Sequence, residues 1–239
     1  MENDYLARLP DDLRAFVMDI EREAEIDIKV AVDGSRAGRR PGEPDPLACD
    51  IDEDGATILI PRADYFPDGS VLHELLHINR FLVEQVPQIN VCEAHWSPQL
   101  ETVFGQLDNN LEHLVIVPEE LRRRPARRDR WVSVIDRTLN EIRSGKLQQA
   151  DRDFLGIYTL AFIDHVLNDP ALRERSESIL DGLGLRDRAV VFRDAIIPAL
   201  ASKEATTRIC VEQFRLVEDP ICFDYLDPRS SSRRQTGIK

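Results

Sequence analysis

The sequence predicts an α+β fold dominated by helices, with a small, mostly antiparallel sheet followed by one key helix and a helical C-terminal half. Three observations support this prediction. Alternating and β-branched segments are concentrated before residue 61. Apolar residues at helical spacing occupy most of the later chain. The stretch 151–168 is apolar nearly all round, which is typical of a buried central helix.

The N-terminal part predicts a helix and then a strand. Pro10 suits the first helical position, and the acidic Asp11 and Asp12 suit the positive end of a helix. Helical spacing of apolar residues then predicts a helix over 10–24. Residues 26–32 alternate and are β-branched, so we expect a strand with one buried face. The Gly-, Pro- and Arg-rich stretch 33–46 predicts a loop.

A β-hairpin is expected next. The apolar segments 48–51 and 56–60 flank Asp52-Glu53-Asp54-Gly55, in which Gly55 stands where the turn needs a positive φ. Pro61 ends the second strand because proline has no N–H to donate.

The remainder predicts helices. Residues 88–97 are expected to form a loop and 98–117 a helix that Pro118 stops. Further helices are expected at 131–145, 151–168, 170–183, 187–202 and 204–217. We expect a single domain over 1–227, with a core at 26–120 and a helical extension at 121–227, and a split into two domains near residue 120 is the alternative. A disordered tail is expected at 228–239, where apolar residues are scarce.

Composition excludes several classes of protein. The net charge of −13 argues against general nucleic-acid binding. No run approaches 18 apolar residues, so no membrane span is expected, and the first residues lack the pattern of a signal peptide. The four cysteines are widely separated and form no CxxC pair, which predicts reduced, mostly structural thiols. We therefore expect a soluble cytoplasmic protein.

The key helix contains HExxH, with His73, Glu74 and His77. On a helix over 69–84 the two histidines lie one turn apart and project from one face, where they could chelate one zinc ion. Glu74 then flanks the metal as a candidate general base. The alternative is an amphipathic helix whose two histidines are solvated surface residues.

These residues resemble the zincin metallopeptidases, over about 26–117. The resemblance implies one Zn²⁺ per chain, a peptide or protein substrate, and a substrate-facing edge strand, for which Thr57–Pro61 is the candidate. A purely structural hairpin is the alternative for that segment. The extended HExxHxxGxxH pattern is missing, because Arg80 and Val83 stand at its last two fixed positions, which argues against a metzincin.

Catalytic zinc usually has three protein ligands, so a third must come from elsewhere. Glu112 is preferred, because it flanks the apolar stripe of the 98–117 helix and fits zincins with a glutamate ligand. Asp108 and His113 remain alternatives, although the helical phase points His113 toward solvent, and His95 is a further candidate. Glu112 as an ordinary exposed acid is the competing interpretation.

Supporting roles are less specified. His95, His113, Tyr158 and His165 are candidates for stabilising an oxyanion, with His165 better explained as a core residue. Asp108 is the candidate that orients a ligand histidine. The arginines between Arg122 and Arg130 form either a basic patch for an acidic partner or a linker that neutralises nearby acidic groups.

The leading hypothesis is a zinc-dependent peptidase. The alternative is a non-catalytic binding or regulatory protein on a zincin scaffold, with or without zinc. A third hypothesis is a helical interaction protein in which HExxH is accidental. Glu74 favours the enzyme, because a structural zinc has no use for that carboxylate.

Overall fold

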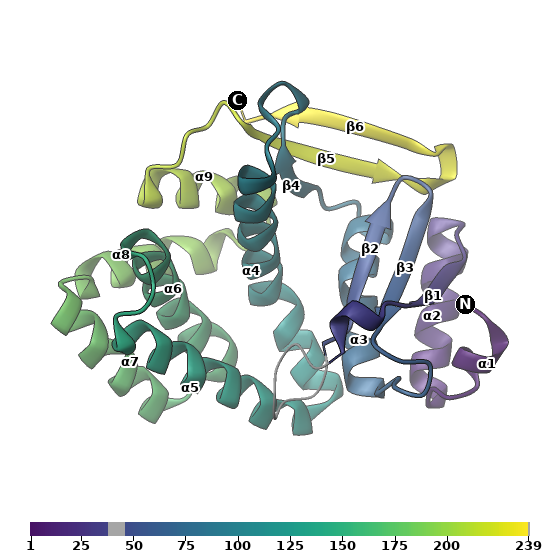
Figure 1. Ribbon diagram of the computed structural model, residues 1–239, viewed down its shortest axis with the longest axis horizontal. Coiled ribbons are helices and arrows are strands. Elements are labelled where there is room, and N and C mark those ends of the chain that lie inside the picture. Colours follow the sequence, from purple (N-terminus) through teal and green to yellow (C-terminus); the bar gives the residue numbers. More distant parts are fainter. Residues whose placement is uncertain (38–45, 239) are drawn as a thin grey trace. The chain divides into compact units, whose positions relative to one another are not determined.

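The structure is a computed structural model that describes residues 1–37 and 46–238 (Figure 1). It divides into two compact units: unit 1 is Met1–Asp108 with Ile221–Gly237, and unit 2 is Asn109–Pro220. The single domain expected over 1–227 and its two-domain alternative both stay predictions. The boundary lies inside helix α4 (Pro98–Arg123), and the C-terminal segment returns to unit 1 by pairing with a strand far away in sequence.

The first sheet of unit 1 contains β1 (Ile28–Val32), β2 (Ala48–Asp52) and β3 (Gly55–Ile60), in the order β1-β3-β2. The pairing of β2 with β3 is antiparallel and confirms the predicted hairpin, while β1 pairs with β3 in parallel. Since β3 has a partner on each side, the prediction of Thr57–Pro61 as the exposed edge is wrong. The two edges of this sheet belong to β1 and β2.

The hairpin turn is stabilised by its own side chain. The Asp52 carboxylate accepts hydrogen bonds from the backbone N–H groups of Asp54 at 2.9 Å and Gly55 at 3.1 Å. Gly55 has φ of 140°, a conformation that glycine adopts without a steric penalty. Of the predicted loop 33–46, residues 38–45 lie outside the described residues, and Gly34–Arg36 form a short 3-10 turn.

Three helices accompany this sheet: α1 (Asn3–Leu6), α2 (Asp11–Ala24) and α3 (Asp68–Ile78). A π-helical turn over Asn79–Val83 continues α3, so the predicted helix over 69–84 is confirmed. The helix α3 packs against α2, β2 and β3. Because it has neighbours on several sides, even polar residues of α3 are buried.

A second sheet in unit 1 contains β4 (Gln88–Val91), β5 (Ile221–Asp227) and β6 (Ser232–Gly237), all antiparallel. The predictions of a loop at 88–97 and a disordered tail at 228–239 are therefore wrong within the described residues. The tail orders through polar groups. Asp224, which is 1% exposed, accepts hydrogen bonds from Asn90 and Gln235, each at 2.9 Å, and from Arg233.

A disulfide joins Cys92, just after β4, to Cys222 in β5, with the two Cα atoms 5.2 Å apart. The prediction that all four cysteines are reduced is wrong for this pair, while Cys49 and Cys210 remain thiols. The expectation of a reducing compartment depended on four thiols and loses that basis.

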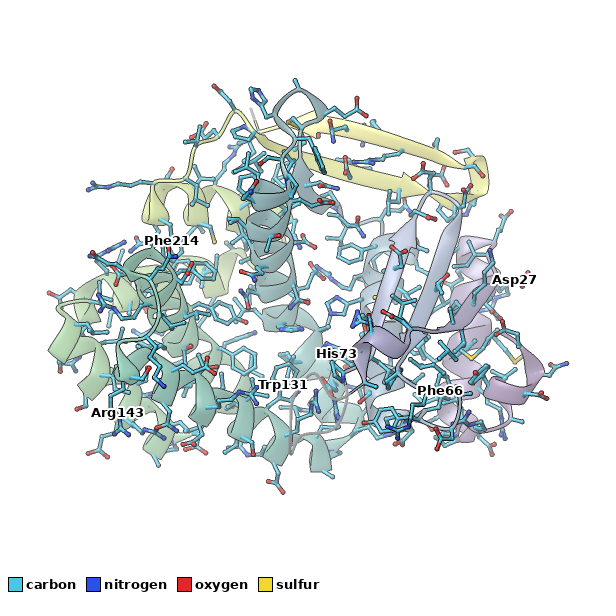
Figure 2. The ribbon with its side chains drawn as sticks, in the orientation of Figure 1. Asp27, Phe66, His73, Trp131, Arg143 and Phe214 are labelled. Atoms are coloured by element: carbon cyan, nitrogen blue, oxygen red, sulfur yellow. A yellow bond between two sulfur atoms is a disulfide. The ribbon has the colours of Figure 1, made fainter. Side chains whose placement is uncertain are left out.

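Unit 2 holds the second part of α4 and five further helices: α5 (Arg128–Ser144), α6 (Gln149–Phe162), α7 (Pro170–Leu183), α8 (Arg186–Ala199) and α9 (Lys203–Phe214). The helix α6 packs against α5, α7 and α8, which confirms the prediction of a central buried helix. An aromatic cluster joins the last helices: the Phe214 ring (Figure 2) lies 4.9 Å from Phe154 and 5.5 Å from Phe192.

The helix α4 does not stop at Pro118 as predicted but continues to Arg123. Proline removes one helical hydrogen bond and crowds the carbonyl four residues before it, which usually bends a helix without always ending it. The continuation places Glu120 in the interior of unit 2, with no exposed surface. No helix in the described part of the chain is long and apolar enough to cross a membrane.

Candidate metal centre

The helix α3 presents the two histidines of HExxH side by side. The rings of His73 and His77 have their centroids 5.0 Å apart and meet edge to face at 81°. The His77 ring also stacks on Phe81 from the π-helical turn, at 6.2 Å and 17°. His73 is half-buried and His77 is 6% exposed, so the alternative of two solvated surface histidines does not describe this pair.

Glu74 is buried, with 7% of its surface exposed. The thiol of Cys49, on the edge strand β2, lies close enough to Glu74 for the carboxylate to affect it. Burial, and then the nearby Glu74 carboxylate, raise the pKa of the Cys49 thiol well above its ordinary value. The general-base candidate is therefore held between its helix and the edge of the sheet. The spacing of the sequence alone gave no indication of the Cys49 contact.

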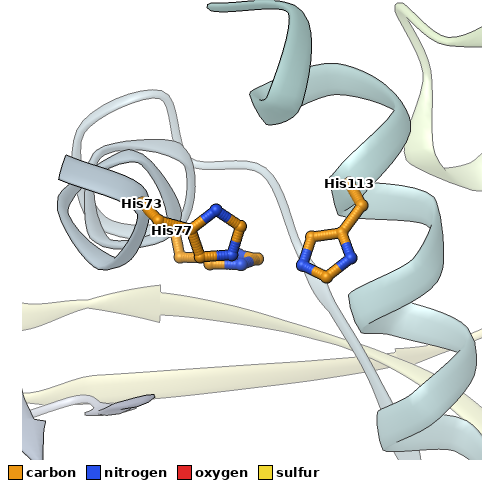
Figure 3. Close-up of side chains that lie close together, drawn as sticks. All are labelled: His73, His77 and His113. Atoms are coloured by element: carbon orange, nitrogen blue, oxygen red, sulfur yellow. The ribbon is translucent and has the colours of Figure 1, made fainter. Parts of the chain in front are cut away.

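The third histidine is His113 of α4. His73 and His77 belong to unit 1 and His113 belongs to unit 2, and each offers a ring nitrogen that could bind a metal ion; Figure 3 labels the three side chains.

Glu112, the preferred third ligand, is not part of this group. Its side chain is 1% exposed and accepts a hydrogen bond at 2.7 Å from the Nζ of Lys203, itself 3% exposed. Consecutive helical residues differ by about 100° in direction. Glu112 therefore points into the interior of unit 2, and the side chain of the next residue, His113, points in a different direction. His113 does not point to solvent as expected: it is half-buried, and its ring centroid lies 5.1 Å from that of Trp131.

The other residues predicted as ligands or supporting groups each have their own contacts. Asp108 accepts a hydrogen bond from the backbone N–H of Ile89 at 2.8 Å and so ties β4 to α4 within unit 1. His95 is exposed in the 3-10 turn Glu93–His95, and His165 is half-buried in a π-helical turn. The Tyr158 hydroxyl donates to the Asn110 carbonyl at 2.9 Å, and burial raises its pKa.

The arginine-rich segment is largely engaged in ion pairs within unit 2. Arg122 and Arg123 each bind Glu119 at 2.6 Å. Arg127 binds Glu120 at 2.5 Å, and Arg128 binds Asp169 at 3.2 Å. These contacts favour the interpretation of arginines that neutralise neighbouring acidic groups.

Comparison with known proteins adds no family: no family model matches the chain, and no curated protein and no solved structure matches it. Function is therefore inferred from the residues and geometry of the chain itself.

Proposed function

We propose that this protein is a zinc-dependent peptidase in which His73, His77 and His113 bind the metal and Glu74 is the general base. The observation that carries the proposal is the pair of adjacent imidazoles on the HExxH helix of unit 1, with ring centroids 5.0 Å apart, beside the buried Glu74. His113 is proposed as the third ligand because Glu112 is paired with Lys203 in the interior of unit 2. Three histidines and an open fourth position are an established ligand set for catalytic zinc.

The chemistry follows from the residues. Zinc bound by these histidines would polarise a peptide carbonyl and make water a better nucleophile. Glu74 accepts a proton from the attacking water as the new C–O bond forms, and returns it to the amine nitrogen as the C–N bond breaks. The burial of Glu74 and its contact with Cys49 restrict its motion, which supports a role in proton transfer at a fixed position.

The first test is metal content. We expect purified protein to bind about one zinc per chain, and His113→Ala to lose most of it. Glu112→Gln is the matched control, because Glu112 is the neighbouring residue and its carboxylate pairs with Lys203. Zinc binding that survives His113→Ala but is lost in a folded Glu112→Gln variant would reassign the third ligand to Glu112.

The second test separates binding from catalysis. Glu74→Gln should retain zinc and lose cleavage of a mixed peptide library, by two to four orders of magnitude for a general base. Glu84→Gln is the control, since Glu84 is an exposed acid on the turn that follows α3 and pairs with Arg80. Wild-type protein that binds zinc and cleaves no peptide would instead support a non-catalytic binding protein.

A further inference from the structure

A buried tryptophan lies against the third histidine. The rings of His113 and Trp131 are 5.1 Å apart, centroid to centroid, and meet at 69°. Trp131 is 7% exposed and comes from α5, so the contact lies within unit 2. Figure 2 marks Trp131 on that helix. The indole of Trp131 also contacts Phe162, with the two ring centroids 5.5 Å apart. The His113 side chain therefore has a bulky, ordered neighbour.

The indole is itself fixed by a buried carboxylate. The Trp131 ring N–H donates to Oε2 of Glu120 at 3.1 Å, and the Arg127 guanidinium donates to Oε1 at 2.5 Å. Glu120 has no exposed surface, so both bonds form away from bulk water. A charge-assisted bond of this kind is stronger and more directional than one between neutral groups. Three successive contacts therefore connect Arg127 to Glu120, Glu120 to Trp131, and Trp131 to the ring of His113.

We propose that Trp131, held by Glu120, is a positioning residue that orients the imidazole of His113 for metal binding. This inference rests on the metal centre proposed above. A ligand histidine binds tightly only when its ring is held in the productive orientation, and groups behind the ligands commonly supply that constraint. The proposal also gives a purpose to Arg127 within the arginine-rich segment.

The expected effect follows from the strength of such contacts. An edge-to-face aromatic pair contributes enough to change metal affinity by about 2- to 10-fold. Trp131→Leu should therefore weaken Zn²⁺ binding by about that factor and alter the visible spectrum of bound Co²⁺. Trp131→Phe keeps an aromatic ring but loses the N–H that donates to Glu120, so it should recover part of the affinity.

Two controls separate positioning from general damage to the fold. Phe192→Leu removes a similarly buried aromatic residue of unit 2, which contacts Phe214, and should leave zinc affinity and the Co²⁺ spectrum unchanged. In a His113→Ala background, Trp131→Leu should have no additional effect on the residual affinity, because the ligand it positions is missing.

Fluorescence gives a second, independent measurement. The chain has two tryptophans, and Trp96 is 58% exposed. In a Trp96→Phe variant the emission of Trp131 alone should change on titration with one equivalent of Zn²⁺, and the change should disappear when His113 is replaced by alanine.

The outcomes distinguish this inference from the proposed function. Unchanged zinc affinity and Co²⁺ spectrum in Trp131→Leu, or an equal loss in Phe192→Leu, would overturn the positioning role alone. Failure of the wild-type chain to bind zinc would overturn the metal centre and the positioning role together. Zinc binding without peptide cleavage would contradict the peptidase and leave the positioning role to be judged by affinity.

Discussion

The buried pair of Glu112 and Lys203 gives a quantitative prediction about stability. Both side chains are almost fully enclosed, with exposed fractions of 1% and 3%, and their charged atoms are 2.7 Å apart. Glu112→Leu would leave the Lys203 ammonium in the interior of unit 2 without this partner. Breaking a buried ion pair in this way costs about 3–5 kcal/mol. The corresponding fall in melting temperature is roughly 6–20 °C.

A double variant separates the missing partner from other effects. Replacing both residues, Glu112→Leu with Lys203→Met, removes both charges and should restore stability to within about 1 kcal/mol of wild type or exceed it. The backbone carbonyl of Lys203, which accepts hydrogen bonds from the hydroxyls of Thr206 and Thr207, is unaffected by this change.

The assay is urea denaturation monitored by far-ultraviolet circular dichroism. The m-value, which is the slope of the unfolding free energy against urea concentration, is compared among the variants. A loss below about 1 kcal/mol in Glu112→Leu, or a double variant no more stable than the single one, would refute the reasoning. The double variant should also retain zinc wherever it is folded, because the pair contributes no ligand.

Three further predictions concern other groups. Cys222→Ser should lower stability by about 2–5 kcal/mol in denaturant titrations, since its disulfide closes a loop with a sequence separation of 130, and wild type in reductant should match it. Hydrogen bonds, first from Arg122, lower the pKa of Glu119 from 4.5 to about 2, so the carboxylate stabilises the fold above pH 4.5 and this contribution is lost as pH falls toward 2. The stability difference between wild type and Glu119→Gln should therefore shrink over that range. Burial raises the pKa of Cys210 to about 12, so iodoacetamide at mildly alkaline pH should label this thiol slowly in folded protein and rapidly in urea; equal rates would contradict its burial.

Local patterns predicted the elements that depend on neighbours in the sequence. The hairpin of β2 and β3 was expected because a turn with Gly55 lies between two short apolar runs, and the side chain of Asp52 closes that turn locally. The helices of unit 2 were expected because helical spacing is a property of a single segment. For the same reason, His73 and His77 could be placed together without any tertiary information.

Patterns of this kind failed where partners are distant. The segment 228–239 is poor in apolar residues, yet β6 forms because Asp224 and β5 supply its partners. The disulfide joins residues whose separation carries no recognisable motif. The edge of the first sheet was misplaced because a parallel pairing with β1 put β3 in the centre.

The sequence by itself determined the HExxH helix, its two adjacent imidazoles and the helical character of the second half, because each follows from the 3.6-residue period of one segment. Only the tertiary structure showed that Glu112 is buried against Lys203 in unit 2, which leaves His113 as the proposed third ligand. Neighbouring residues on a helix face different directions, and which direction is interior depends on what packs there. Lys203 meets Glu112 and Trp131 meets His113, and both partners come from helices that no local pattern could assign to α4.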